Sequence, residues 1–165
     1  MFSKRVCQAL HEEHRATIGL AERIGGLLER HRRNRPDAAD GPTQRLLNEI
    51  PTAMGADVSR HFDFEEAELF AHLAAAGDVA IGAHLTDDHE IMRPLGQELA
   101  QLARTAAAGG FDETRWRDFR RVGEELCNRM LEHVQKEEMV LLPLLEESLD
   151  SEDDARLYAS YVGND

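Results

Sequence analysis

The feature that most limits the fold of this chain is a motif that occurs twice. His-x-x-x-Glu stands at His61 and Glu65 and again at His133 and Glu137, 72 residues later. Four residues advance about 400° around an α-helix, so the His and the Glu of each copy lie on one face, about 6 Å apart along the axis. A repeat of such long period predicts two equivalent helical hairpins that face each other and present the same groups at the centre.

The first and third helical segments repeat in the same way. Leu10-His-Glu-Glu-His14 aligns with Leu85-Thr-Asp-Asp-His89 at a displacement of 75 residues. Each terminal His falls within the apolar stripe of its own segment. The centre therefore receives one His from each of four helices and one Glu from each of two, and the candidate metal ligands are His14, His61, Glu65, His89, His133 and Glu137.

The sequence predicts an all-α fold, an antiparallel up-down-up-down four-helix bundle with a short C-terminal helix. Ala, Leu, Glu and Arg fill long stretches at helical spacing, and a chain of 165 residues suits one core. Short polar connections containing Gly or Pro separate the helices. We expect the bundle to occupy residues 1–149, and an acidic tail with the short helix to occupy residues 150–165.

The expected helix limits follow from caps and helix breakers. The first helix starts at Ser3 as N-cap and ends near residue 31. The second spans about 43–76, with Pro51 either kinking or restarting it, and the third spans about 79–108, with Pro94 inside it. The fourth runs from Asp112 or Thr114 toward residue 143, and the tail helix spans 151–161.

The four imidazoles and two carboxylates are flanked by Phe, Leu and Met residues, which predicts that they are buried. Buried ionisable groups are strongly unfavourable unless a cation or a complete hydrogen-bond network compensates them. A metal is the simpler compensation. This donor set suits two hard-to-borderline divalent ions, with iron first, manganese second and zinc third.

In these residues the chain resembles the hemerythrin-like family, the HHE cation-binding domain, from about residue 10 to residue 145. The family pattern is a His on the first helix, His-x-x-x-Glu on the second, a His on the third, and His-x-x-x-Glu or Asp on the fourth. The resemblance implies two iron ions, bridged by oxo, hydroxo or water. It also implies that one metal takes His14 and His61, the other takes His89 and His133, and Glu65 and Glu137 bridge both.

One position departs from the family members that carry oxygen reversibly. These have His-x-x-x-His on the third helix, whereas Leu85 stands four residues before His89. His84 is adjacent, but five residues correspond to about 140° around the helix, so His84 reaches the metal only through a bulge or an unwound turn. Two His per metal leave more open positions, which favours binding or sensing of oxygen, peroxide or nitric oxide over reversible oxygen carriage.

Two other classes of function stay open. One is a di-iron oxidase, either ferroxidase-like or peroxide-decomposing, and its motivation is the low histidine count together with two Glu bridges. The other is an iron-responsive interaction module, which the acidic tail would serve. Ferritin-like proteins are disfavoured, because they use Glu-x-x-His and the residues three before the candidate His ligands are His11, Val58, Thr86 and Met130.

Carboxylates beside the candidate ligands have two interpretations. Glu66 and Glu138 follow the ligand Glu residues, and the acidic pairs 12–13 and 87–88 precede ligand His residues. These groups either accept hydrogen bonds from the imidazoles or form a solvated face. Residues without a counterpart in the other half are interpreted as structural, and they are His11, His31, His72, His84, Cys7 and Cys127.

Composition limits the partners. The formal net charge is −13, which repels nucleic acid and anionic lipid surfaces. No segment approaches the roughly 20 apolar residues that span a bilayer, and no apolar stretch with a cleavage site opens the chain. We therefore expect a cytoplasmic protein whose partners are a small diatomic ligand or peroxide and a redox protein, without nucleic-acid or membrane partners. The oligomeric state is left open.

Overall fold

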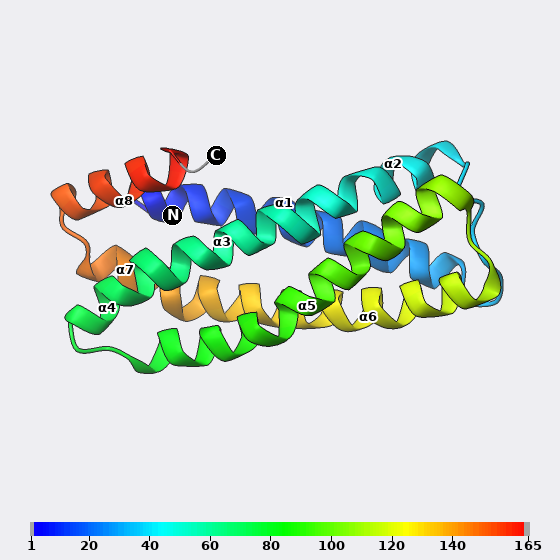
Figure 1. Ribbon diagram of the computed structural model, residues 1–165. Helices are drawn as coiled ribbons and strands as arrows, with labels where there is room; N and C mark the ends of the chain where they lie inside the picture. The colour runs from blue at the N-terminus through cyan, green and yellow to red at the C-terminus, as the bar shows by residue number, and fades with distance from the viewer. Residues whose placement is uncertain (1, 164–165) are drawn as a thin grey trace.

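The computed structural model describes residues 2–163, and Figure 1 shows its helices. Met1 and the last two residues of the predicted tail, Asn164 and Asp165, lie outside this range. Between residues 2 and 163 the ordered elements are all helices and no strand is present. The prediction of an all-α fold is therefore confirmed.

The helices follow one another with short connections. α1 spans Arg5–Arg30. The second rod is continuous and consists of α2 (Gly41–Ile50), the π-helical turn η1 (Pro51–Asp57), α3 (Val58–Phe64), the π-helical turn η2 (Glu65–Leu69) and α4 (Phe70–Ala75). α5 spans Ala80–Gly109. The fourth rod consists of α6 (Glu113–Lys136), the π-helical turn η3 (Glu137–Leu141) and α7 (Leu142–Ser148), and α8 (Ser151–Gly163) closes the described chain.

The long rods pack side by side as a helical bundle (Figure 1). α5 contacts α6 on one side, and α2 and η1 on the other, while α1 packs against α6. α8 lies against α1 near the N-terminus of the chain, where Figure 1 shows the red and blue ends together. None of the helices within the described range combines the length and the apolar composition that crossing a membrane requires.

The second and fourth rods contain π turns that the sequence analysis did not predict. Pro51 opens η1, and the rod continues through it without restarting. In η2 the N–H of Phe70 donates to the carbonyl of Glu65, five residues earlier, and in η3 the N–H of Leu142 donates to the carbonyl of Glu137. Both turns therefore begin at a candidate ligand. Widened turns of this kind are often found at functional sites.

The start of α1 differs from the prediction that Ser3 is the N-cap. Lys4 occupies the cap position and makes no side-chain cap bond. The carboxylate of Asp154, from α8, instead accepts hydrogen bonds from the backbone N–H groups of Arg5 and Val6 at 3.0 Å each. Helix N-termini leave such donors unsatisfied, so a carboxylate distant in sequence replaces the local cap.

The fourth rod starts as one of the two predicted alternatives. Asp112 is the N-cap of α6, and its Oδ1 accepts from the backbone N–H of Arg115 at 2.8 Å. The rod continues past Pro143 to the end of α7. Pro143 lies within the first two residues of α7, directly after η3, where a missing N–H is tolerated.

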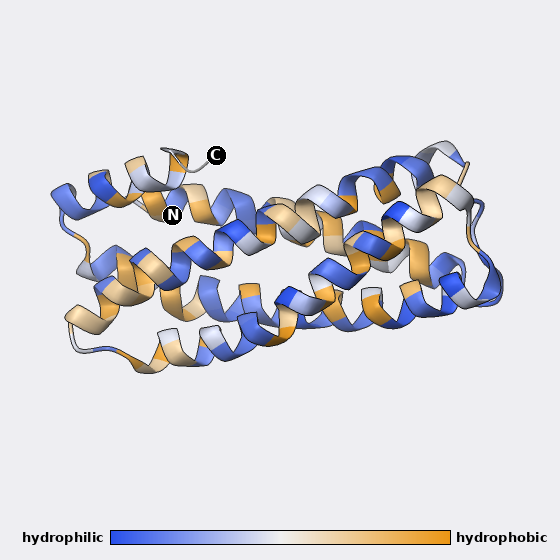
Figure 2. Ribbon diagram, viewed as in Figure 1, coloured by the Kyte–Doolittle hydropathy of each residue, from blue (hydrophilic) through white to orange (hydrophobic). Residues whose placement is uncertain are grey.

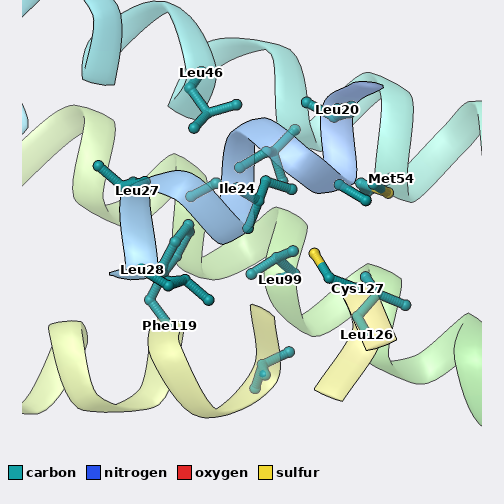
Figure 3. Packing of buried hydrophobic residues seen from close by; sticks show 14 of the residues in the cluster. Leu20, Ile24, Leu27, Leu28, Leu46, Met54, Leu99, Phe119, Leu126 and Cys127 are labelled. Atoms are coloured by element: carbon teal, nitrogen blue, oxygen red, sulfur yellow. The ribbon is translucent and has the colours of Figure 1, made fainter. Parts of the chain in front are cut away.

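Two apolar clusters fill the bundle, one on each side of the candidate ligands. The first joins residues such as Leu20, Ile24, Leu99 and Phe119, and Figure 3 shows how they interlock. The second joins Val6, Leu10, Leu69, Leu85 and Leu141, among others. On every rod, orange apolar residues alternate with blue polar ones at helical spacing (Figure 2), as expected for helices that bury one face.

Gly96 of α5 allows the closest approach between two rods. A Cβ at this position would lie 2.4 Å from the carbonyl oxygen of Met54 in η1, well inside van der Waals contact. Any other residue therefore pushes α5 away from η1. Since η1 runs directly into α3, which carries His61, this contact helps to fix α3 relative to α5.

We expect Gly96→Ala to destabilise the protein by about 1–3 kcal/mol, the usual result of overpacking a tight contact. Gly25→Ala is the matched control, because a Cβ there meets nothing within 4 Å and alanine favours the helix by about 0.5–1 kcal/mol. Urea unfolding followed by circular dichroism measures both changes. Equal stabilities of the two variants would contradict the proposed contact.

Candidate metal centre

The six predicted ligands meet in one buried layer between the two apolar clusters. They form two groups, each with four ligand atoms that all lie within 4.8 Å of one another. The least exposed members are Glu65 and His89, both fully buried, and the most exposed, His61, is 8% exposed. The first group is His14, His61, Glu65 and Glu137, and the second is Glu65, His89, His133 and Glu137.

The two carboxylates belong to both groups. Oε1 of Glu65 lies 3.2 Å from Nε2 of His61, and its Oε2 lies 3.3 Å from Nε2 of His89. Glu137 mirrors this arrangement, since its Oε2 lies 3.1 Å from Nε2 of His14 and its Oε1 lies 2.8 Å from Nε2 of His133. Each carboxylate therefore offers one oxygen to each group, which is the geometry of a bridging ligand.

The close contacts at the centre are mostly not hydrogen bonds. Both oxygens of Glu65, Oε1 of Glu137 and Nε2 of His14 are buried and have no hydrogen-bond partner within the described residues, although neighbours lie within 3.3 Å. The His–Glu distances are short, but these contacts do not have hydrogen-bond geometry. Since buried polar atoms are almost always satisfied, these lone pairs converge on a position that a metal cation fits.

A second layer of carboxylates surrounds the imidazoles. Each Nδ1 has an acidic partner from the neighbouring rod: His14 with Glu138 at 2.6 Å, His61 with Glu13 at 3.2 Å, His89 with Glu66 at 2.7 Å, and His133 with Asp88 at 3.2 Å. Glu12 and Asp87, the other members of the acidic pairs, are exposed. This answers the question left by the two interpretations: Glu138, Glu66 and Asp88 hydrogen-bond to imidazoles, Glu13 lies within ion-pair distance of His61, and Glu12 and Asp87 are solvated.

These outer contacts close into a ring around the bundle. The first rod supplies the carboxylate for the second, the second for the third, the third for the fourth, and the fourth for the first. An acceptor at Nδ1 fixes the ring orientation and leaves Nε2 facing the centre with its lone pair available. The same contacts thus tie the four rods together and orient all four imidazoles.

Access to the four imidazoles is unequal. A cavity of about 150 Å³ opens between α1 and the rod of η1 and α3, and its walls include His14, His61 and His133. One water needs only roughly 10–15 Å³ of such volume, so the cavity admits a small ligand. His89 is covered instead, because the ring of Phe62 stacks on it with centroids 3.8 Å apart.

Comparison with known proteins agrees with this geometry. Residues 6–145 match the family described as Hemerythrin HHE cation binding domain. The chain belongs to this hemerythrin family. Its members bind metal cations, and the two His/Glu groups are where this hemerythrin domain would hold them. No curated protein and no solved structure matches the chain.

The ionisable groups of the hemerythrin domain shift one another's pKa in opposite directions. Burial by itself lowers the pKa of His61, but interactions with Glu65, Glu13 and Glu137 together outweigh it, and the pKa ends well above its usual value. Burial raises the pKa of Glu137, yet interactions with His133 and His14 lower it well below its usual value. Without a metal, protons on the imidazoles therefore supply the positive charge that the carboxylates require.

The remaining histidines and the cysteines lie outside both groups. His84 is exposed on a regular stretch of α5, without the bulge that would turn it toward the centre, and Leu85 is fully buried beside it. His72 lies 4.0 Å from Asp153, and His31 packs edge-on against Trp116. Burial is the main factor that raises the pKa of the Cys7 and Cys127 thiols to about 12, and both cysteines are free.

We expect metal affinity to rise with pH, because a metal must displace the imidazole protons. A probe ion such as Co²⁺ should bind more tightly at about pH 8 than at about pH 6 and should release protons in weakly buffered solution. A pH-independent affinity would contradict this expectation.

The metal-free protein should show the opposite trend in the same range. The raised pKa of His61 stabilises the fold fully below 6.5, its usual value, and this contribution is lost as the pH rises through the higher folded-state pKa. Chemical denaturation of metal-free protein at several pH values measures this trend. The lowered pKa of Glu137 acts only in the acid range, because its contribution is lost as the pH falls below 4.5 toward the folded value.

Proposed function

We propose that the chain is a hemerythrin-like protein that holds a carboxylate-bridged di-iron pair and binds or senses oxygen, peroxide or nitric oxide. The observation that carries the proposal is the pair of complete His/Glu groups that share both carboxylates. The bundle in this proposal is the antiparallel up-down-up-down arrangement of four helices. A cytoplasmic location and a protein redox partner belong to the same proposal.

The distances support the following ligand assignment. One iron takes His14 and His61, and the other takes His89 and His133, because each pair approaches a different oxygen of the shared carboxylates. Glu65 and Glu137 then bridge the pair, together with an oxo, hydroxo or water bridge. Mixed imidazole and carboxylate donors suit iron, with manganese or zinc as alternatives.

The unequal access to the four imidazoles supports binding of a small ligand. A reduced iron pair supplies electrons to oxygen, peroxide or nitric oxide. The cavity is lined by both imidazoles of the first group and by His133 of the second, whereas Phe62 shields His89. Leu20, Met130 and Val134 also line the cavity and keep its inner wall apolar, which favours a neutral diatomic ligand over bulk water.

A ferroxidase-like activity is the second candidate, and the cavity supplies the observation that favours it. Glu49 and Asp57 line the cavity together with Glu13, so the path to the centre carries carboxylates that would attract a cation. Catalytic consumption of ferrous iron or peroxide by loaded protein distinguishes an oxidase from a sensor. An iron-responsive interaction module would instead show metal-dependent stability without turnover.

The test is anaerobic reconstitution with ferrous iron followed by exposure to oxygen. We expect about two metal ions per chain and an oxo-to-iron charge-transfer band, as a bridged pair of this composition requires. Metal analysis and absorption spectroscopy measure both. Absence of both would overturn the proposal.

Single substitutions test which residues bind the metal ions. Glu65→Ala should lose at least one metal ion and the charge-transfer band, because it removes an oxygen from each group. His84→Ala is the matched control, since this exposed imidazole lies outside both groups and its removal should change neither metal content nor spectrum. A Glu65→Ala protein that retains both metals and the band would refute the assignment.

A further inference from the structure

Each of the four outer carboxylates has a second polar partner besides its imidazole. These partners are His11 for Glu138 at 2.8 Å, Arg93 for Glu66 at 3.0 Å, Lys136 for Asp88 at 2.8 Å, and the hydroxyl of Tyr161 for Glu13. Three of these partners lie on the rods that carry the ligands. Tyr161 lies on α8, beyond residues 6–145 that match the family.

The internal repeat explains why the tail supplies this fourth partner. The displacement that aligns His89 with His14 aligns Asp88 with Glu13, and the displacement that aligns the two His-x-x-x-Glu motifs aligns Lys136 with Phe64. Asp88 therefore has the ammonium group of Lys136 as a donor, whereas the corresponding position beside Glu13 holds the apolar ring of Phe64. The ring of Tyr161 lies edge-on against Phe64, with centroids 5.2 Å apart, and its hydroxyl donates to Glu13.

A single oxygen connects the tyrosine to the metal centre. Oε2 of Glu13 accepts the hydrogen bond from Tyr161 and also lies 3.2 Å from Nδ1 of His61. Both Glu13 and His61 line the cavity that leads to the centre. A change in the position of Glu13 therefore changes the orientation of His61 on the accessible side.

We propose that Tyr161 is a positioning residue of the metal centre, which holds Glu13 against His61 from a helix outside the family-matched segment. Its hydroxyl donates to Glu13, just as the ammonium group of Lys136 donates to Asp88 in the other half of the repeat. Because Tyr161 belongs to α8, the docking of this helix adjusts the position of Glu13 and, through it, the orientation of His61. The inference rests on the proposed function insofar as His61 binds a metal.

The docking of α8 does not depend on this hydroxyl. Asp154 of α8 accepts two backbone hydrogen bonds at the start of α1, and the guanidinium of Arg5 lies 4.0 Å above the ring of Tyr158. Leu157 is fully buried in the second apolar cluster. Tyr161→Phe therefore removes the hydrogen bond to Glu13 while these other contacts keep the helix in place.

The experiment compares wild-type protein, Tyr161→Phe and Tyr158→Phe, each loaded with Co²⁺. Tyr161→Phe should shift the ligand-field spectrum and release Co²⁺ to a chelator about three- to tenfold faster, less than the 10–100-fold typical of a direct partner of a ligand. Tyr158→Phe, which removes a hydroxyl from the same helix, should behave as wild type. A Tyr161→Phe spectrum and release rate equal to those of wild type would overturn the proposal.

A double-mutant cycle tests whether Tyr161 acts through Glu13. In a Glu13→Gln background, Tyr161→Phe should add little to the release rate, because the oxygen that it positions has changed. Effects that multiply independently in the double variant would show that Tyr161 acts by another route, and would overturn the proposal.

Metal-free protein separates this inference from the proposed function. The imidazole nitrogen signals of His61 in nuclear magnetic resonance should change in Tyr161→Phe and stay constant in Tyr158→Phe. If wild-type protein takes up no metal, the di-iron proposal fails while these signals still decide the contact: a change confined to Tyr161→Phe supports it, and no change overturns it.

Discussion

Glu65 and Glu137 are two carboxylates buried at the centre of an apolar bundle, and the rest of the structure depends on how their charge is balanced. Burying an unpaired carboxylate is strongly unfavourable, so positive charge must accompany each one. His14, His61 and His133, whose pKa values are raised by the neighbouring carboxylates, supply it as protons in the metal-free protein, and metal cations can replace those protons. The layer between the two apolar clusters is therefore a site whose stability and metal content are linked.

The widened turns of the rods place these carboxylates. η2 and η3 begin at Glu65 and Glu137, and the extra residue in each turn shifts the helix that follows relative to the one before. η1 adds a third such turn before α3, on the rod that borders the cavity. Its close contact with Gly96 fixes this rod against α5, so the fold combines local widening with tight packing.

The two halves of the repeat agree at the centre and diverge toward the surface. The inner ligands and the carboxylates behind them correspond pairwise, which gives a nearly symmetric core. Farther out, Lys136 corresponds to Phe64, and the cavity opens beside His61 while Phe62 covers His89. The two similar His/Glu groups therefore have unequal surroundings, and Tyr161 of α8 contacts Glu13 beside the group that contains His14 and His61.

The sequence by itself determined the helical fold class, its main helix limits and the six residues that meet at the centre. It could do so because helical periodicity is local and because the repeat doubles each signal, from His14 paired with His89 to Glu65 paired with Glu137. The assignment of these residues as metal ligands stays a prediction, as does the boundary between bundle and tail near residue 149. The prediction that Ser3 is the N-cap of the first helix was wrong, because the carboxylate of Asp154 from α8 replaces a local cap.

Only the tertiary structure decided which flanking carboxylates bind imidazoles, where the π turns lie, and which side of the site is open. Glu13 binds His61 while Glu12 is solvated, although both are acidic neighbours of His14, because one residue rotates a side chain about 100° and the partner lies on another rod. The cavity and the contact of Tyr161 with Glu13 join segments far apart in the chain. Such contacts depend on how whole helices are packed, and no local sequence pattern records that packing.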